Sequence, residues 1–597
     1  MKGVEVDPVL EALKPLGVYQ LLQAFLIYAG YFACSYQLFS IIFIGQKVEH
    51  ACAHPGNQSD TEFHLSDDFN ISAIQYGRCE IVVPTNSSED VTSENIPCLY
   101  GMQYEKPRDF SIVSEFDLVC DRATLQGLTQ TVLTVGQGVG AILFPALSDR
   151  FGRKRIHIIT HVLLMSGGFA LGVAPNYLAF TVIKFFVGAV QQGVVLTVVT
   201  ANVENFPGIY RGIVGGFGQS FAWAVVTMSF TIWAYFLRLE SWRVQQLAIS
   251  SVSAIVLLQM IFLDEPIRWL MANGRTNEIV RLLKKAAKIN RVNEKNVLRV
   301  FQHVQNPDME YTALDDVPAK ADDVDTSPPA ALNHRAVRME LETEKVVEKL
   351  TLLDLVKNSR LRKNACSFWA IWFINSLTYF ALYLTSGSLT DNIHLSFFLN
   401  VLVEVPACII LIVCINRIGR KKTLMLLHSI AAVGLLTSGI MRSFQGNSQL
   451  QIAATVMSLL GKLGISGSFN CVFFYTPEVF PTNIRNLAVG TGSTAARVGG
   501  MIAPFTGILA DHVIWAPGAI FGTCNMLILI IIRSLPESMG RELPQTVADL
   551  ETWYIPSKTA HSSDISGRDT SGTTERILKS DTINLSGAAI PMQSKQE

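Results

Sequence analysis

Charged residues are scarce in this chain. They make up 16% of its 597 residues, while hydrophobic residues make up 49%. Soluble globular proteins carry about 25% charged residues. The formal net charge is −1, so the basic excess of a nucleic-acid-binding protein is missing. These shortages exclude an ordinary soluble domain and a nucleic-acid partner, and they indicate a chain embedded in a lipid bilayer.

The residue patterns of enzymes and metal sites are also missing. None of the ten cysteines has metal-site spacing, and the sequence shows no nucleophile-and-base constellation and no phosphate-binding loop. We therefore predict no enzyme activity, no cofactor and no metal, and we leave sodium or proton coupling unassigned. Segment 1–16 carries acidic residues where a signal peptide has basic ones. The apolar run after it is predicted to be a true first span with a cytoplasmic N-terminus.

Apolar runs of about 20 residues, the length that crosses a bilayer, are abundant. We predict spans at 17–44, 124–147, 156–174, 178–201, 210–236, 243–263, 363–385, 394–416, 422–441, 450–476, 487–510 and 514–533. They group into an N-terminal bundle (17–263) and a C-terminal bundle (363–533). The segment between them, 264–362, is predicted to be a cytoplasmic loop with surface helices and an acidic, disordered insertion. Segment 534–597 is predicted to be a cytoplasmic, mostly disordered tail.

Charged landmarks occur in the same order in both halves and at nearly the same spacing along the chain. They are Asp149, Arg150, Arg153, Glu204, Arg211, Glu265 and Arg268 in the first half, and Arg417, Arg420, Glu478, Arg485 and Glu537 in the second. Such a repeat indicates two homologous halves that rock about a central site. We predict that these residues form a cytoplasmic latch of ion pairs present in one state only. Asn416 replaces an acid, which predicts a weaker latch in the second half.

The long loop 45–122 is predicted to be extracellular. Basic residues concentrate in the short loops after the second and eighth spans, which places those loops and both termini in the cytoplasm. The opposite side is oxidising, where disulfides persist. The loop contains the disulfide candidates Cys52, Cys79, Cys98 and Cys120, and the glycosylation sequons Asn57, Asn70 and Asn86. Four cysteines allow three pairings, and the sequence does not choose among them.

These features together resemble the major facilitator superfamily, and within it the organic cation, organic anion and carnitine transporter family. The cysteine-containing loop after the first span distinguishes that family from the sugar porters. The segments 461–466, 475–486 and 492–499 are similar to those of carnitine-type members. The resemblance implies an all-α membrane protein of twelve helices in two pseudo-symmetric six-helix bundles. It also implies a plasma-membrane carrier that works by alternating access.

Ionisable residues inside spans are costly and usually functional. Glu404 and Arg497 are predicted substrate contacts, and Lys184 is predicted to have a structural or coupling role. Trp372 and Tyr379 lie on one face of the seventh span, and cation-selective members of the family are similar there. Aromatic faces attract quaternary ammonium groups, and an arginine grips a carboxylate. Together these residues predict a zwitterionic or cationic substrate that resembles carnitine.

Two other functions remain open from the sequence. The chain is also consistent with an organic anion exchanger, in which Arg497 anchors a carboxylate and Glu404 is structural. From a different class, it is consistent with a non-transporting membrane sensor or scaffold, whose central loop and tail bind cytosolic partners. The repeated charged landmarks argue against the sensor, because a protein that no longer transports need not keep them.

Overall fold

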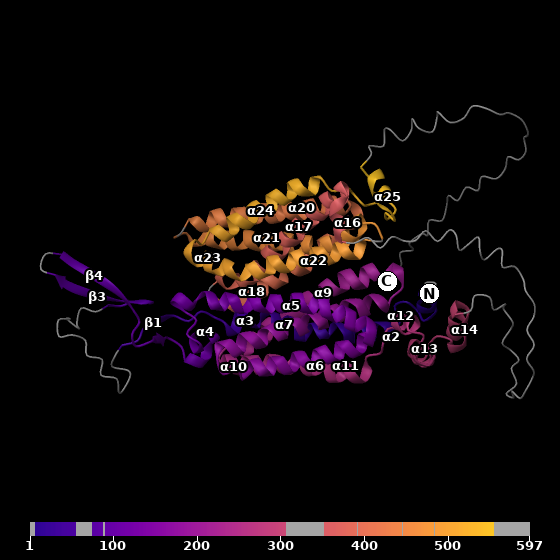
Figure 1. The fold of residues 1–597 in the computed structure, drawn as a ribbon, viewed down its shortest axis with the longest axis horizontal. Coiled ribbons are helices and arrows are strands. Elements are labelled where there is room, and N and C mark those ends of the chain that lie inside the picture. Colours follow the sequence, from indigo (N-terminus) through magenta and orange to yellow (C-terminus); the bar gives the residue numbers. More distant parts are fainter. Residues whose placement is uncertain are drawn as a thin grey trace, which may run out of the picture. The chain divides into compact units, whose positions relative to one another are not determined.

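Helices make up most of the described chain, and each long helix follows an apolar run of the sequence (Figure 1). The computed structural model describes residues 6–54, 75–87, 90–305, 352–390, 392–444, 446–482 and 484–554. Those up to Leu550 belong to one compact unit. Within the described ranges, 11 helical segments are long and apolar enough to cross a membrane.

The N-terminal bundle contains the first six predicted spans. They are α2 (Val18–Tyr28) with α3 (Gly30–Ile44), α5 (Thr124–Phe151), α6 (Arg153–Gly172), α7 (Tyr177–Glu204), α8 (Gly208–Gly212) with the π-helical η5 (Ile213–Gly218) and α9 (Gln219–Phe236), and α10 (Trp242–Val252) with η6 (Ser253–Ile255) and α11 (Val256–Phe262). Glycines let α5 and α7 pack closely: a Cβ on Gly136 would lie 2.0 Å from the Phe185 carbonyl oxygen. Small residues at helix contacts are typical of membrane bundles.

The C-terminal bundle repeats this arrangement. Its helices are α17 (Ser359–Leu384), which follows α16 (Leu352–Lys357), η7 (Ser386–Ser388), α18 (Ile393–Leu402) with α19 (Glu404–Arg417), α20 (Arg420–Ser443), α21 (Ser448–Val479), α22 (Arg485–Ile502) with η8 (Ala503–Phe505) and α23 (Thr506–His512), and α24 (Ala516–Arg533); α25 (Val547–Thr552) comes after them. The predicted span 487–510 corresponds to α22–α23. It is not among the 11 apolar segments, because glycine, serine, threonine and Arg497 lower its hydropathy. The predicted two-bundle membrane fold is confirmed.

Asparagines begin several of these helices. The side chains of Asn176, Asn358, Asn392 and Asn447 accept hydrogen bonds from backbone N–H groups in the first turns of α7, α17, α18 and α21. Those N–H groups have no partner within their own helix, and an asparagine cap supplies one. The apolar runs therefore start at defined residues.

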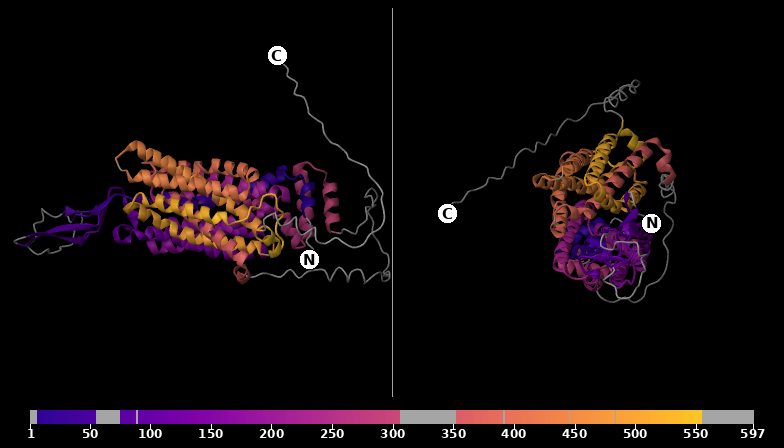
Figure 2. Two further views of the ribbon diagram at one scale, coloured as in Figure 1. Left: turned by 90° about the horizontal axis from the view of Figure 1, so that it is seen from above. Right: turned by 90° about the vertical axis from the view of Figure 1, so that its left-hand side faces the viewer.

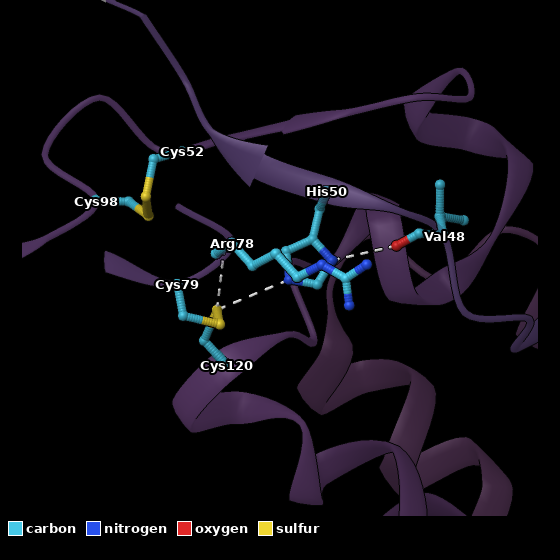
Figure 3. The surroundings of a disulfide bond; sticks show 7 residues. All are labelled: Val48, His50, Cys52, Arg78, Cys79, Cys98 and Cys120. Atoms are coloured by element: carbon cyan, nitrogen blue, oxygen red, sulfur yellow. Dashed lines mark hydrogen bonds between the residues drawn. A yellow bond between two sulfur atoms is a disulfide. The ribbon is translucent and has the colours of Figure 1, made fainter. Parts of the chain in front are cut away.

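The loop after the first span folds into a small disulfide-bonded cap. Strand β1 (His50–Cys52) pairs antiparallel with β5 (Met102–Tyr104), and β2 (Gln75–Tyr76), β3 (Glu80–Ser87) and β4 (Asp90–Pro97) form an antiparallel sheet. Short helices η3 (Arg108–Phe110), α4 (Ile112–Glu115) and η4 (Cys120–Arg122) lead to α5. The disulfides are Cys52–Cys98 and Cys79–Cys120 (Figure 3). The sequons Asn57 and Asn70 lie outside the described residues, and Asn86 lies in β3.

The opposite end of the bundles, here called the linker end, carries short amphipathic helices (Figure 2). They are α1 (Asp7–Ala12), α12 (Ile267–Ala272), α13 (Thr276–Asn290) and α14 (Glu294–Gln305). Their apolar faces form a separate core that includes Val9, Leu10, Leu283 and Phe301. The Asn290 side chain joins this layer to the first span, because it donates to the Leu13 carbonyl and accepts from the Tyr19 N–H. The predicted acidic insertion lies outside the described residues.

The two bundles meet through aromatic side chains near the cap. The Phe39 ring of α3 stacks on Tyr383 of α17, with 4.4 Å between ring centroids. Phe397 of α18 lies edge-on to Phe43 and Phe230, at 5.4 Å and 6.0 Å. Edge-on and offset stacked pairs are the favoured arrangements of aromatic rings. This contact joins residues from helices far apart in the sequence into one core cluster.

Candidate functional site

The first copy of the repeated landmarks forms a dense cluster of charges at the linker end. The Arg153 guanidinium lies 2.8 Å from both Glu204 and Asp149. The backbone N–H groups of Arg153 and Lys154 both donate to the Glu265 carboxylate. Burial raises the pKa of Glu265 although these N–H groups oppose the shift. The cluster therefore joins the α5–α6 turn, the end of α7 and the segment after α11 within one bundle.

The second copy repeats this geometry with one acid fewer. Arg420 lies 2.9 Å from Glu478, and its backbone N–H donates to Glu537 at 2.9 Å. Asn416 stands where the first copy has Asp149. Ser538 Oγ donates at 2.7 Å to Glu478 Oε2, the same oxygen that lies 2.9 Å from Arg420. Both clusters lie within their own bundles, so they stabilise the linker end of each half.

A glycine makes each cluster possible. Gly152 and Gly419 adopt φ of 108° and 92°, a region that side-chain-bearing residues avoid. A Cβ on Gly152 would lie 2.8 Å from the Glu265 carboxylate, and one on Gly419 would lie 2.7 Å from that of Glu537. The glycine of each repeated Gly-Arg pair is therefore a steric requirement of the half-buried carboxylate beside it.

The remaining predicted landmark arginines differ in their exposure and in their partners. Arg150 and Arg417 are exposed at the two turns. Arg211 and Arg268 pair with Asp7 of α1 rather than with the acids of their own motifs. In the second half, Arg485 Nε donates to the Phe480 carbonyl at 3.4 Å, and its buried Nη2 has no hydrogen-bond partner among the described residues.

Arg497 lies at the contact between the bundles. Its Nη1 donates to Gln137 of α5 at 3.0 Å, and its Nη2 donates to Gln192 of α7 at 2.8 Å. Gln137 in turn donates to Gln191 at 2.9 Å. Within the described ranges, no carboxylate pairs with Arg497, and its buried Nε has no hydrogen-bond partner. Neutral amides therefore hold an uncompensated positive charge.

Glu404 is placed in a different environment. Lys462 of α21 lies 3.3 Å from Glu404 Oε1, and both side chains are buried. The Tyr383 hydroxyl donates to the same oxygen at 2.7 Å. The Lys462 ammonium lies 3.6 Å and 3.5 Å from the ring centroids of Tyr379 and Tyr383. We call Glu404, Tyr379 and Tyr383 the aromatic cage; Lys462 fills it.

Trp372 and Lys184 complete the predicted set. The Trp372 indole N–H donates to Thr476 at 3.1 Å, and its ring lies edge-on to Phe473 with 4.4 Å between centroids. Lys184 is fully buried in the N-terminal bundle, 3.3 Å from Ser40 Oγ and 3.5 Å from the Gln37 carbonyl oxygen. The structure thus places Trp372 on α17, the helix that also carries Tyr379 and Tyr383, and Lys184 in the other bundle.

A cavity of about 560 Å³ lies at the cap end, where residues of both halves and of the cap line it. Lys47 and Asp511 form an ion pair across its wall, one from each half of the chain. Polar side chains of Gln46, Gln126 and Gln130 also line the cavity. The cavity therefore lies where the cap meets both halves of the chain.

Sequence reasoning missed Lys462, Asp7 and the glutamines that hold Arg497. Lys462 lies inside an apolar run, so the rule that selected Glu404 also applies to it.

His50, Cys79 and Cys120 lie close together, but both sulfur atoms are in a disulfide and provide no thiolate for a metal (Figure 3).

Two homologous helical bundles, each with an Arg–Glu ion pair at the linker end, define a multi-pass membrane transporter built from a repeat. The family model described as Major Facilitator Superfamily matches residues 121–504, and the chain belongs to that superfamily. It is therefore a transporter and not an enzyme.

Similar proteins narrow the family further. The chain is 28% identical to an organic cation transporter protein of Drosophila melanogaster, over 92% of this chain and 94% of the relative. It is 28% identical to human organic anion transporter 3, over 87% and 88%. Its fold matches that of the xylose transporter XylE from E. coli in a partially occluded inward-open conformation, with TM-score 0.56, 15% identity, and 88% and 100% coverage. The predicted resemblance to the organic cation and organic anion transporters is confirmed.

Proposed function

We propose that the protein is a plasma-membrane carrier of small organic anions that works by alternating access, with Arg497 as the carboxylate anchor. The observation that supports this choice is the difference between the two buried charges. Lys462 compensates Glu404, while neutral glutamines hold Arg497. A carboxylate would replace the two amide contacts by a bidentate ion pair, whose two parallel N–H···O bonds match the planar guanidinium and whose negative charge compensates it.

A zwitterion such as carnitine is the second candidate. Its carboxylate would bind Arg497, and its quaternary ammonium would need the aromatic cage. The cage has suitable groups, but Lys462 must leave it first. A simple cation would be repelled by two positive charges, Lys462 and Arg497. We therefore rank it last among the three substrate classes. The relatives include both cation and anion transporters, so their names do not choose between these substrates.

The charge distribution supports an orientation with the linker end in the cytoplasm. Arg150, Arg153, Lys154 and Arg155 follow the second span at that end, as the positive-inside rule requires. The disulfides of the cap suit the extracellular side. In this orientation the cavity beneath the cap faces outward, and the charge clusters stabilise the cytoplasmic ends of both bundles.

Uptake of labelled salicylate, carnitine and tetraethylammonium tests the proposal. We compare cells that express the wild type, Arg497→Gln, or Arg238→Gln, which removes an exposed arginine at the end of α9. We expect saturable salicylate uptake that falls to background in Arg497→Gln and persists in Arg238→Gln. Salicylate uptake that is the same in Arg497→Gln as in the wild type would refute the role of Arg497 as the carboxylate anchor. Carnitine uptake well above salicylate uptake would favour the zwitterion.

A further inference from the structure

The cavity beneath the cap has the size and the wall of a ligand site. Its volume is about 560 Å³, within the roughly 300–1,000 Å³ of small-molecule sites. Most of the residues that line it are apolar, among them Ile42, Leu118, Ile393 and Ile508. An apolar wall with a few polar groups is the usual composition of such sites. The cavity is therefore suited to an amphipathic molecule.

One amide in this wall lacks a partner. The Gln130 side chain of α5 is 6% exposed, and its Oε1 has no hydrogen-bond partner among the described residues. Its Nε2 makes a long bond of 3.5 Å to the Leu38 carbonyl oxygen. Because buried amide oxygens normally accept a hydrogen bond, Gln130 is suited to a ligand that carries an O–H or an N–H.

The charges in the wall compensate each other. Lys47 and Asp511 both line the cavity and form an ion pair, and the lining contains no other lysine, arginine or acidic residue among the described residues. An ionic ligand would lose hydration here without gaining a free counter-charge, whereas a neutral ligand avoids that cost. The cavity therefore differs in kind from the surroundings of Arg497, where we expect an anion.

The wall comes from both halves of the chain. Ile42 of α3 and Gln126 of α5 belong to the first half, and Ile393 of α18 and Ile508 of α23 belong to the second. A carrier that rocks its halves about a central site must part them at this end when the site opens outward. A molecule that contacts both walls would bind the present conformation more tightly than the parted one, and would shift the population towards it.

We propose that this cavity is an extracellular binding site for a neutral amphipathic molecule, which has an apolar body and a hydroxyl or amide donor for Gln130. The bound molecule holds the carrier closed to the outside. It thereby lowers the maximal rate of transport without occupying Arg497. The effect on transport and the extracellular side rest on the proposed function, but the binding itself does not.

Protection of an introduced thiol tests the binding on the full-length protein in intact cells. The reporter is Gly507→Cys, because Gly507 lines the cavity and a Cβ on it would meet no atom within 4 Å among the described residues. The matched control is Ser448→Cys, an exposed position at the same end of the molecule and outside the cavity lining. The reagent is a charged, membrane-impermeant maleimide, and the unsubstituted protein gives the background labelling.

The probe is 4-phenylbutan-1-ol, and its methyl ether has the same apolar body without the donor. A ligand at ten times its Kd leaves about a tenth of the sites free, so the alcohol should slow the labelling of Gly507→Cys about tenfold. It should leave Ser448→Cys unchanged. The ether should bind more weakly than the alcohol, and Gln130→Leu in the reporter background should abolish that difference.

Several results would overturn the proposal. They are an absence of protection, equal protection of Ser448→Cys, and an ether as effective as the alcohol, which would indicate an effect through the bilayer. Failure of the reagent to label Gly507→Cys from outside would refute the extracellular position. Should Gly507→Cys not fold, Gly387→Cys replaces it, because a Cβ on Gly387 would lie 3.5 Å from Ile393, an ordinary contact.

Uptake separates this inference from the proposed function. In the wild type, the alcohol should lower the maximal rate of salicylate uptake and leave KM unchanged. A rise in KM alone would mean competition at the substrate site and would refute a separate site. A protein that takes up no salicylate, but whose Gly507→Cys is protected, would refute the anion carrier and support the cavity as a binding site.

Discussion

Asp7 pairs with Arg268, although one residue begins the first helix of the described chain and the other follows the sixth span. The same carboxylate lies 3.0 Å from Arg211 and accepts the Gly208 N–H at 3.0 Å. One acid thereby joins α1, α8 and α12. The two arginines belong to the repeated landmarks, but their acid comes from outside the repeat.

Asp7→Asn should loosen α1 in a pH-dependent way. Burial alone would raise the pKa of Asp7, but the Gly208 N–H and the guanidinium groups of Arg268 and Arg211 hold it below its usual value. The stabilisation is therefore present above the ordinary aspartate pKa and is lost as the pH falls through the lowered one. For a partly exposed pair we expect about 1 kcal/mol or less. Thermal unfolding at pH 7 should distinguish the variant from the wild type, and the difference should vanish at strongly acidic pH.

Arg153→Gln should be more harmful than Arg420→Gln. Among the described residues, Arg153 compensates the two acids Glu204 and Asp149, and Arg420 compensates the single acid Glu478. Removing one partner of a buried pair costs about 3–5 kcal/mol, and the more exposed Arg420 should cost less. The measurement is the amount of folded protein at the cell surface and the uptake per molecule. Equal losses in both variants would contradict the asymmetry that Asn416 introduces.

Alanine should not replace Gly152 or Gly419. The positive φ and the adjacent carboxylate act together, and we expect a loss of about 2 kcal/mol or more in each variant. Gly138→Ala is the matched control, because Gly138 is helical and a Cβ on it would meet no atom within 4 Å among the described residues. Thermal unfolding of the three variants in detergent gives the comparison. A control as unstable as the other two would show that the carboxylate contacts are not responsible.

The cap should contain the two disulfides as paired here. Peptide mapping without reduction should recover Cys52 linked to Cys98 and Cys79 linked to Cys120. Replacing Cys79 and Cys120 together by serine should destabilise the cap by about 2–5 kcal/mol. Faster proteolysis of 75–122 in the variant would report this loss. Recovery of any other pairing from the wild type would refute the assignment.

Local patterns were enough to predict the bundles and the repeat. Apolar length indicated the spans, and the landmarks around Arg153 and Arg420 indicated the two halves. Local patterns did not predict which side chains of different helices pair with each other. Whether Glu404 faces Lys462 depends on the rotation of α19 and α21 about their axes, which hydropathy does not encode. Asp7 was missed because a charge before the first span usually faces solvent, and the disulfide pairing depends on how the cap strands align.

The hydrogen bonds of Arg497 have a kinetic consequence. Gln137 and Gln192 belong to one bundle and Arg497 to the other, so the empty anchor ties the two halves together. A bound carboxylate that pairs with the Arg497 guanidinium would displace the amides of Gln137 and Gln192. This displacement would remove the link between the two bundles. We expect the loaded carrier to reorient faster than the empty one. Labelled salicylate should then leave preloaded cells faster when unlabelled salicylate is outside, and the protein would behave as an exchanger.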